Sequence, residues 1–303
     1  MKNTYYSNGK LLLTGEYVVL DGAMALAIPT KYGQSLEIES SDKPGIHWKS
    51  LDEENKIWFE DTFELNSLEG EKSQNPISKT LSSILIEARK LNPNFLSDEI
   101  GYKIITKLDF PRNWGLGTSS TLINNIAQWS KTDGFLLLKN SFGGSGDDIA
   151  ASQNNSPIFF KIKNDQPEIK QTSLDWDFKE SVFFVHLNEK QDSKQGIAHY
   201  KKIIADKLPI KRISEISLEL SKCKTLGDFV ALIEEHERII SETIKMPTIK
   251  EKLFKDYPGA LKSLGAWGGD FVLATGNSRN MVYFEEKGFK TIISFSKMAT
   301  LNP

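Results

Sequence analysis

Glycines and hydroxyl side chains gather in residues 111–120, which read Pro-Arg-Asn-Trp-Gly-Leu-Gly-Thr-Ser-Ser. Residues 100–110 before them alternate between apolar and mostly polar types, as a half-buried strand does. After them apolar residues recur at helical spacing, and the hydroxyls of residues 118–120 are available as helix caps. Two glycines at a strand-to-helix corner let the backbone approach a ligand and direct helix N–H groups at it. The stretch can therefore cradle a phosphate, although an ordinary connection has the same local pattern.

Charged side chains flank a short apolar strand near the N-terminus. Lys10 precedes three leucines at residues 11–13, and Gly15 and Glu16 follow them. A lysine and a glutamate held around a rigid strand can form a polar site. The alternative is an ion pair on the surface, which contributes little.

Two adjacent carboxylates, Asp147 and Asp148, follow a glycine-rich turn at residues 143–146. Beside a bound phosphate, an aspartate can take a hydroxyl proton or help to hold magnesium. An aspartate pair before a helix is also a common N-terminal cap, so both interpretations stand.

A third glycine cluster occupies residues 265–269 and leads directly into an apolar strand. It is either a hairpin turn or a second loop that closes over the phosphate region.

Regular elements must position these motifs. Strands are expected at residues 11–13, 34–40, 45–49, 57–65, 100–110, 158–162, 181–187, 271–275 and 291–295, and helices at 78–91, 118–129, 133–139, 194–207, 213–221, 226–244 and 279–286. The turn at residues 52–55 closes a hairpin, and its acidic side chains are expected to be solvated. His236 lies on the helix over 226–244, where a packed or exposed side chain is expected rather than a catalyst. A domain boundary is expected near Ser156.

Composition limits the function classes. The chain has 303 residues and a net charge of −2, so a broad cationic face for nucleic acid or anionic lipid is not expected. Cys223 is the single cysteine, which excludes an intrachain disulfide and a cysteine-based zinc site. The sequence shows no secretory segment and no apolar run of membrane length. These features predict a cytoplasmic protein with no nucleic-acid partner and no membrane, although a local basic patch could still serve a phosphorylated small-molecule substrate.

Four stretches together resemble the GHMP kinases, the superfamily of galactokinase, homoserine kinase, mevalonate kinase and phosphomevalonate kinase. They are Gly9-Lys10 with Gly15-Glu16-Tyr17, then Pro111-x-x-x-Gly115-Leu116-Gly117-Thr118-Ser119, then Gly144-Ser145-Gly146-x-Asp148, then Gly265-Ala266-x-Gly268-Gly269. The order and the near full-length span make coincidence improbable. The Gly-Glu-Tyr opening favours the mevalonate-pathway branch, and Gly-Asp-Asp-Ile-Ala at residues 146–150 resembles the motif of the bacterial GYDIA subgroup.

The resemblance implies an α+β fold with two domains, 1–156 and 157–303, the first like ribosomal protein S5 domain 2 and the second ferredoxin-like. It implies ATP and Mg²⁺ as cofactors, with Asp148 as the base and Lys10 as its charge partner. The ATP-binding residues that it implies are Pro111, Gly115, Leu116, Gly117, Thr118, Ser119 and Ser120, with the Ser119 hydroxyl near magnesium. The substrate-binding residues that it implies are Glu16, Tyr17, Gly144, Ser145, Gly265, Ala266, Gly268 and Gly269.

The chain departs from the family at three places. The glutamate that relatives use as a magnesium ligand has no counterpart in residues 133–139, and we hypothesise that Asp147 or Asp270 supplies the carboxylate. Trp114 and Trp267 stand where relatives often carry small residues, and either narrow the cleft, touch the nucleotide or pack in the core.

The function expected is phosphoryl transfer from ATP to mevalonate or phosphomevalonate by a monomer or homodimer. The alternatives are a non-catalytic homologue that binds a nucleotide or metabolite, and a diphosphomevalonate decarboxylase. The motif glycines do not fix the acceptor, because acceptor choice depends on side chains around the cleft.

Overall fold

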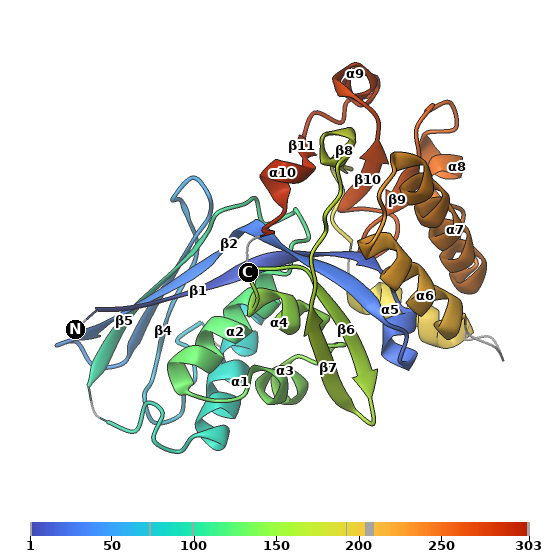
Figure 1. Ribbon diagram of the computed structural model, residues 1–303. Helices are drawn as coiled ribbons and strands as arrows, with labels where there is room; N and C mark the ends of the chain where they lie inside the picture. The colour runs from blue at the N-terminus through green and yellow to red at the C-terminus, as the bar shows by residue number, and fades with distance from the viewer. Residues whose placement is uncertain (1, 73, 99, 192, 204–208, 302–303) are drawn as a thin grey trace. The chain divides into compact units, whose positions relative to one another are not determined.

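The computed structural model describes residues 2–72, 74–98, 100–191, 193–203 and 209–301, and its chain forms two compact units (Figure 1). Unit 1 comprises Met1–Gly9, Tyr32–Arg112 and Gly117–Gln153. Unit 2 comprises Lys10–Lys31, Asn113–Leu116 and Asn154–Pro303. The glycine loop is therefore divided between the two units, and the expected domain boundary after Ser156 stays a prediction.

Two long paired strands contribute residues to both units. They are β1 (Lys2–Thr14) and β2 (Ala25–Ser41). The leucines at 11–13 are buried, as expected of an apolar strand. Strand β2 begins well before the expected residue 34, because residues 25–28 are all apolar and all buried and so show no alternation.

The strands of unit 1 form a mixed sheet. Its members beside β2 are β5 (Gly101–Leu108), β3 (Ile46–Leu51) and β4 (Ile57–Phe63). Strand β2 pairs antiparallel with β5, β5 parallel with β3, and β3 antiparallel with β4. The expected hairpin across residues 52–55 is confirmed, and the Asp52 carboxylate accepts hydrogen bonds from the backbone N–H groups of Glu54 and Lys56.

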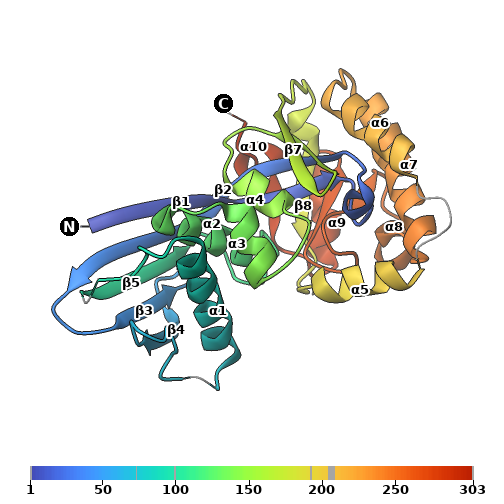
Figure 2. The same cartoon turned by 90° about the horizontal axis from the view of Figure 1, so that it is seen from below.

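Helices cover one face of this sheet (Figure 2). They are α1 (Pro76–Leu91), α2 (Thr118–Ser130), α3 (Gly134–Ser141) and α4 (Asp147–Ser152). The apolar stripe of α1, which includes Leu81 and Leu85, packs in one core with Trp48 and Phe63 of the strands and Ile126 of α2. This core fixes α2, the helix that the glycine loop enters.

Unit 2 contains a separate antiparallel sheet in the order β11, β8, β10, β9. These strands are β8 (Val182–His186), β9 (Leu261–Ser263), β10 (Phe271–Thr275) and β11 (Ile292–Ser294). The hairpin of β6 (Ile158–Lys163) and β7 (Gln166–Gln171) pairs with residues 25–27 of β2. Strand β7 was not expected from the sequence, because its residues are mostly exposed and polar and show no strand pattern.

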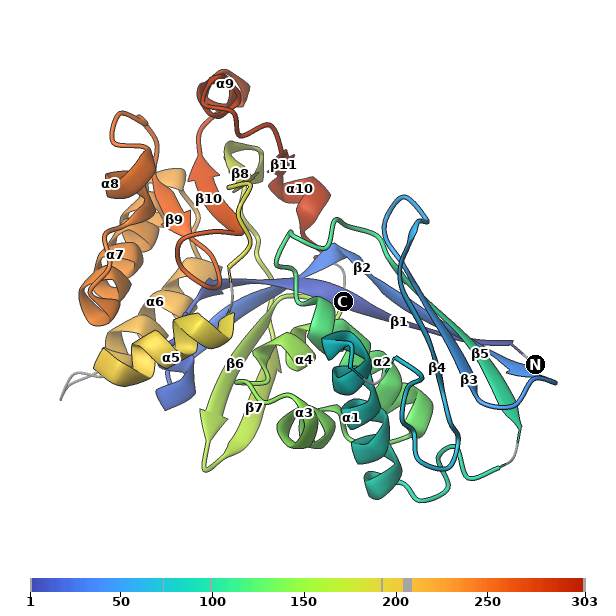
Figure 3. The same cartoon turned by 180° about the vertical axis from the view of Figure 1, so that it is seen from behind.

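Helices of unit 2 pack beside this sheet (Figure 3). They are α5 (Ser193–Ile203), α6 (Ile210–Ser221), α7 (Leu226–Ile244), α8 (Ile249–Leu253), α9 (Ser278–Glu286) and α10 (Phe295–Met298), with short 3₁₀ helices η1 (Val18–Asp21) and η2 (Lys179–Ser181). Helix α7 has the expected bounds and lies against α6 and β9. Residues 204–207 of the helix expected over 194–207 lie outside the described residues. No helix in the described ranges is long and apolar enough to cross a membrane.

Candidate active site

The glycine loop ends at the N-terminus of α2. The N-cap is Gly117, in the left-handed region with φ 84°, so the expected capping by the hydroxyls of residues 118–120 is wrong. These residues form the first turn of the helix instead. Glycine takes the left-handed conformation without a Cβ penalty and has no side chain to cap the helix. The N–H groups of the first turn thus receive no cap from this residue, which suits an anion.

The first half of the loop is fixed within unit 2. The backbone N–H of Lys10 donates to the carbonyl of Leu116 at 3.1 Å, which ties β1 to the loop. The Trp114 ring meets the Phe271 ring edge to face, with centroids 5.5 Å apart. His186 accepts the N–H of Asn188 at Nδ1, so its Nε2–H donates to the carbonyl of Asn113 at 3.1 Å. The Trp114 ring centroid also lies 6.5 Å from that of the His186 ring, so Trp114 packs against strands β8 and β10.

Gly115 lies directly against the carboxylate of Asp270. A Cβ at position 115 would lie 2.3 Å from the Asp270 Cγ, and Gly115 has φ 68°. Asp270 is itself left-handed, with φ 54°, and its Oδ1 accepts the Gln191 N–H at 3.2 Å. Burial raises the pKa of Asp270 to about 6, against the opposing effect of that hydrogen bond and of Lys190 and Lys10. One carboxylate hypothesised for magnesium thus adjoins the glycine loop.

The aspartate pair lies in the first turn of α4. The N-cap of this helix is Gly146, so the alternative in which the pair caps the helix is wrong. Asp147 is buried and accepts a hydrogen bond from the Ser145 hydroxyl, while Asp148 is half-buried. Helix α4 is held on α2 by Gln153, whose Nε2 donates to Asn124 Oδ1 at 2.9 Å. Two helix N-termini of unit 1 thus carry predicted site residues.

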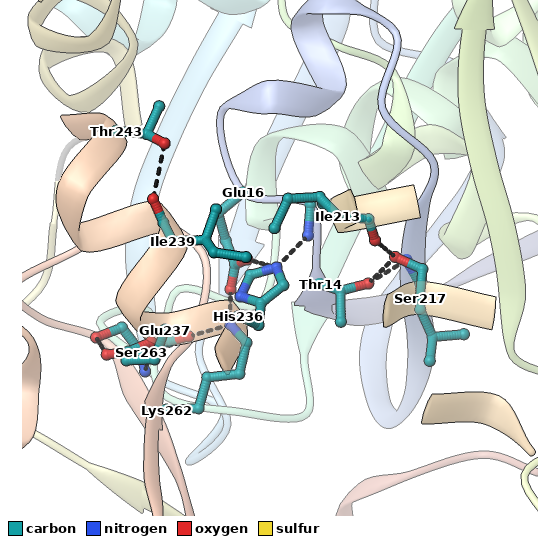
Figure 4. Close-up of polar contacts among 12 residues, drawn as sticks. Thr14, Glu16, Ile213, Ser217, His236, Glu237, Ile239, Thr243, Lys262 and Ser263 are labelled. Carbon is teal, nitrogen blue, oxygen red and sulfur yellow. Dashed lines mark hydrogen bonds and ion pairs between the residues drawn. The ribbon is translucent and has the colours of Figure 1, made fainter. Parts of the chain in front are cut away.

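Glu16 is buried rather than part of a surface ion pair (Figure 4). Its Oε1 accepts from the Nζ of Lys262, and both side chains are only 1% exposed. Lys262 Nζ also donates to the Ser263 carbonyl at 2.8 Å. Burial raises the pKa of Glu16 to about 7, although Lys262 lowers it. A buried polar cluster thus adjoins the strand within unit 2, with Lys262 as the partner of Glu16, and the site role expected of Lys10 stays a prediction.

His236 and Glu237 of α7 complete this buried cluster. The Gly15 N–H donates to His236 Nε2 at 2.9 Å. Burial lowers the pKa of His236 well below its usual value, so the ring is neutral and its 3.4 Å approach to Glu16 Oε2 is not a charge pair. Glu237 accepts hydrogen bonds from the Ser263 N–H and hydroxyl. His236 is confirmed as a packed side chain, but sequence reasoning missed the cluster.

Tyr17 reaches the third glycine cluster. The backbone N–H of Trp267 donates to its hydroxyl at 3.0 Å. The Trp267 indole is buried among apolar residues of η1, α5 and α6, so core packing accounts for this tryptophan. Gly269 faces Gln191, where a Cβ would lie 2.7 Å from Cγ.

The predicted site residues fall in both units. Unit 1 holds Pro111, Gly117, Thr118, Ser119, Ser120, Gly144, Ser145, Asp147 and Asp148, and unit 2 holds Lys10, Glu16, Tyr17, Gly115, Leu116, Gly265, Ala266, Gly268 and Gly269. The structure brings together Lys10 with Leu116 and Tyr17 with the third glycine cluster. The roles of all these residues, and the convergence of Lys10, Ser119 and Asp148, stay predictions.

Within the described ranges no group of three or more His, Cys, Asp or Glu side chains could hold a metal ion. Magnesium at nucleotide sites takes one or two carboxylates together with substrate phosphates. Ser119, with either Asp147 or Asp270 as the carboxylate, therefore stays the predicted ligand set.

Comparison with known proteins identifies the fold. No model of a protein family matches the sequence, and no curated protein matches it. Mevalonate kinase of Methanococcus jannaschii matches with a TM-score of 0.73 and 17% identity, over 100% of this chain and 99% of its own. Phosphomevalonate kinase of Streptococcus pneumoniae, solved with phosphomevalonate and AMPPNP, matches with a TM-score of 0.70 and 15% identity, over 96% of this chain and 99% of its own. Galactokinase of Lactococcus lactis matches with a TM-score of 0.68 and 12% identity, over 99% of this chain and 93% of its own. The chain has the α+β GHMP kinase fold, as expected.

Proposed function

We propose that this protein is a GHMP-type kinase that transfers the γ-phosphoryl group of ATP to mevalonate or phosphomevalonate. The observation that carries the proposal is the full-length likeness to solved kinases of both acceptors, combined with the position of the family's glycine motif in this fold. That motif leads from β5 into the N-terminus of α2, where the N-cap is a left-handed glycine. A helix N-terminus of this kind favours a bound phosphate.

Phosphoryl transfer depends on alignment and charge neutralisation more than on covalent chemistry by the protein. In the proposed reaction an acceptor oxygen forms a bond to the γ-phosphorus, and the bond from this phosphorus to the β–γ bridging oxygen breaks to release ADP. Where the acceptor is an alcohol, Asp148 takes its proton and Lys10 steadies the charge. The first turn of α2 receives the phosphates of ATP.

Ser119 and Asp147 would hold Mg²⁺ in this proposal. Asp147 lies in the first turn of α4 with its carboxylate oriented by Ser145, and Ser119 is exposed in the first turn of α2. An oxygen donor set of one carboxylate and one hydroxyl, completed by phosphates, suits magnesium. The ion would neutralise phosphate charge. Unchanged magnesium dependence in Asp147→Asn would exclude this carboxylate.

The proposal is tested by mixing the purified protein with Mg-ATP and each of four acceptors, mevalonate, 5-phosphomevalonate, homoserine and galactose. ADP release is followed, and turnover with one of the first two is expected. Turnover with homoserine or galactose alone would refute the acceptor class. ATP binding without turnover of any acceptor would favour a non-catalytic homologue.

The same assay separates a decarboxylase from a simple kinase. Mevalonate diphosphate decarboxylase of Staphylococcus aureus has this fold, with a TM-score of 0.63 and 11% identity. Diphosphomevalonate is therefore added as a fifth acceptor, and release of carbon dioxide is measured. Its release would assign decarboxylation.

A further inference from the structure

Tyr17 occupies a strained turn. Its backbone has φ 63° and ψ −54°, and the Val18 N–H donates to the Glu16 carbonyl at 2.7 Å. This is a γ-turn of the positive-φ type, which is rare, and an aromatic residue in it is an outlier. Such strain persists only where the surrounding structure holds it, and it gathers at functional sites.

The buried cluster holds the residues on the N-terminal side of this turn (Figure 4). The carboxylate of Glu16 is fixed by Lys262 of β9, and the N–H of Gly15 is fixed by His236 of α7. One residue earlier, the hydroxyl of Thr14 bonds to that of Ser217 in α6 at 2.6 Å. Three elements of unit 2 therefore clamp the residues that lead into the turn.

The cluster is poorly explained by stability alone. Among the described residues, Glu16 Oε2 and His236 Nδ1 are buried without a hydrogen-bond partner. Unsatisfied buried polar groups cost free energy, and a buried ion pair often stabilises a fold no better than apolar side chains of similar size. A conformational role accounts for the presence of these buried polar groups despite their cost in free energy.

The turn directs the Tyr17 hydroxyl at the middle of the third glycine cluster. This hydroxyl accepts the N–H of Trp267 at 3.0 Å, and the Tyr17 ring stacks on Tyr200 with centroids 5.6 Å apart. Gly196 of α5 leaves room for it, because a Cβ there would lie 2.9 Å from the Tyr17 oxygen. These contacts hold the hydroxyl against the loop.

The ends of the loop are held by other contacts. Leu264 donates its N–H to the Phe271 carbonyl at 3.2 Å, and Asp270 donates to the Glu189 carbonyl at 2.7 Å. Between these ends, the Tyr17 hydroxyl holds the loop by accepting the backbone N–H of Trp267.

We propose that Glu16, Lys262 and His236 are positioning residues, which hold the γ-turn so that the Tyr17 hydroxyl fixes residues 265–269 in the shape that receives the acceptor. The part that concerns the acceptor rests on the proposed function. Tyr17 acts through the loop backbone, and Glu16 acts through Tyr17 rather than by touching substrate.

Amide hydrogen exchange tests the hold on the loop without any substrate. In Tyr17→Phe, exchange of the Trp267 amide is expected to become about ten-fold faster, because its acceptor is lost. Tyr257→Phe is the matched control, since it removes another tyrosine hydroxyl of unit 2, one that donates to the Thr275 carbonyl at 2.8 Å. Exchange at Trp267 that is equal in the two variants would overturn the proposal.

A variant cycle tests the link from the cluster to Tyr17. The single variant Lys262→Met leaves the Glu16 carboxylate buried without a cation and is at risk of not folding. The double variant of Glu16→Gln and Lys262→Met removes both charges and so leaves no unpaired buried ion. This double variant is expected to speed Trp267 exchange, and adding Tyr17→Phe to it should change the rate by less than about two-fold. An additive effect would show that the cluster and Tyr17 act separately, against the proposal.

Kinetics test the consequence for the acceptor. For an acceptor that the wild type phosphorylates, Tyr17→Phe is expected to raise the acceptor KM about ten-fold while the ATP KM stays constant. Equal changes in both KM values, or none, would refute the acceptor role. Absence of turnover in the wild type would instead refute the proposed function, and the exchange results would still decide whether Tyr17 holds the loop.

Discussion

Replacing Lys262 with methionine should make the protein's stability abnormally sensitive to alkaline pH. Lys262 is buried, and its Nζ contacts Glu16 and the Ser263 carbonyl. Methionine keeps much of the length and the apolar contacts of the side chain but leaves Glu16 buried without a cation. Removing one partner of a buried ion pair typically costs about 3–5 kcal/mol.

The pKa of Glu16 gives the pH dependence of this cost. In the wild type, burial raises that pKa from 4.5 to about 7. A raised carboxyl pKa makes the folded state bind more protons than the unfolded state, so the contribution of Glu16 to stability falls as pH rises from 4.5 and levels off above about 7. Loss of Lys262 raises the pKa further, so the variant keeps losing stability above pH 7. The gap between wild type and variant should widen there by about 1.4 kcal/mol per pH unit.

Urea unfolding at pH 6, 7, 8 and 9, followed by tryptophan fluorescence, measures this gap. Lys211→Met is the matched control, because Lys211 pairs with Glu215 at 3.9 Å but is 93% exposed, and exposed pairs contribute about 0.3–0.5 kcal/mol. Glu16→Gln with Lys262→Met should abolish the alkaline loss. A gap between wild type and Lys262→Met that is the same at pH 6 and pH 9 would refute the assignment to Glu16.

Three further outcomes are expected. In urea unfolding, Gly115→Ala should lose about 1–3 kcal/mol more stability than Gly288→Ala. Both glycines have positive φ, but only a Cβ at position 115 meets a neighbour, the Asp270 carboxylate, so equal losses of stability in the two variants would contradict this reasoning. Between about pH 4 and 6 the contribution of Asp270 to stability should fall as pH rises, because burial raises its pKa from 3.8 to about 6, and a slope of stability against pH that is unchanged in Asp270→Asn would count against that origin. Asp148→Asn should lower kcat about 10²–10⁴-fold without altering the ATP dissociation constant, whereas Asp165→Asn, at an exposed turn, should alter neither; full activity of Asp148→Asn would exclude it as the base.

Long periodic elements were predictable from sequence, and two of the shortest elements were not. Helix α7 has the bounds expected from its repeat of apolar residues over 19 positions. Strand β9 has 3 residues and helix α10 has 4, which is too few to show either period. The first half of β2 was missed for a different reason, since a run of buried apolar residues does not alternate.

The candidate site divides in the same way. Motif glycines are local in sequence, so the positions of Gly115 and Gly117 at a strand-to-helix corner could be predicted from it. The pair of Glu16 and Lys262 could not, because 246 positions separate the two residues and neither belongs to a pattern that includes the other. The available signal was a lysine in the short segment of residues 260–264 that precedes the third glycine cluster.

Positions where the chain violates local rules coincide around Glu16. A carboxylate and a lysine are buried, a histidine is neutral, and the next residue is an aromatic one at positive φ. Natural sequences violate such rules mainly at functional sites. Because several energetically unfavourable features of different kinds occur at one turn, a common function explains them better than chance does. The resemblance places Glu16 and Tyr17 in one motif, but the two side chains have different surroundings. The Glu16 carboxylate lies between Lys262 and His236. The Tyr17 hydroxyl lies against the backbone N–H of Trp267 in the third glycine cluster. Glu16 thus determines the backbone conformation, and Tyr17 conveys it to the loop.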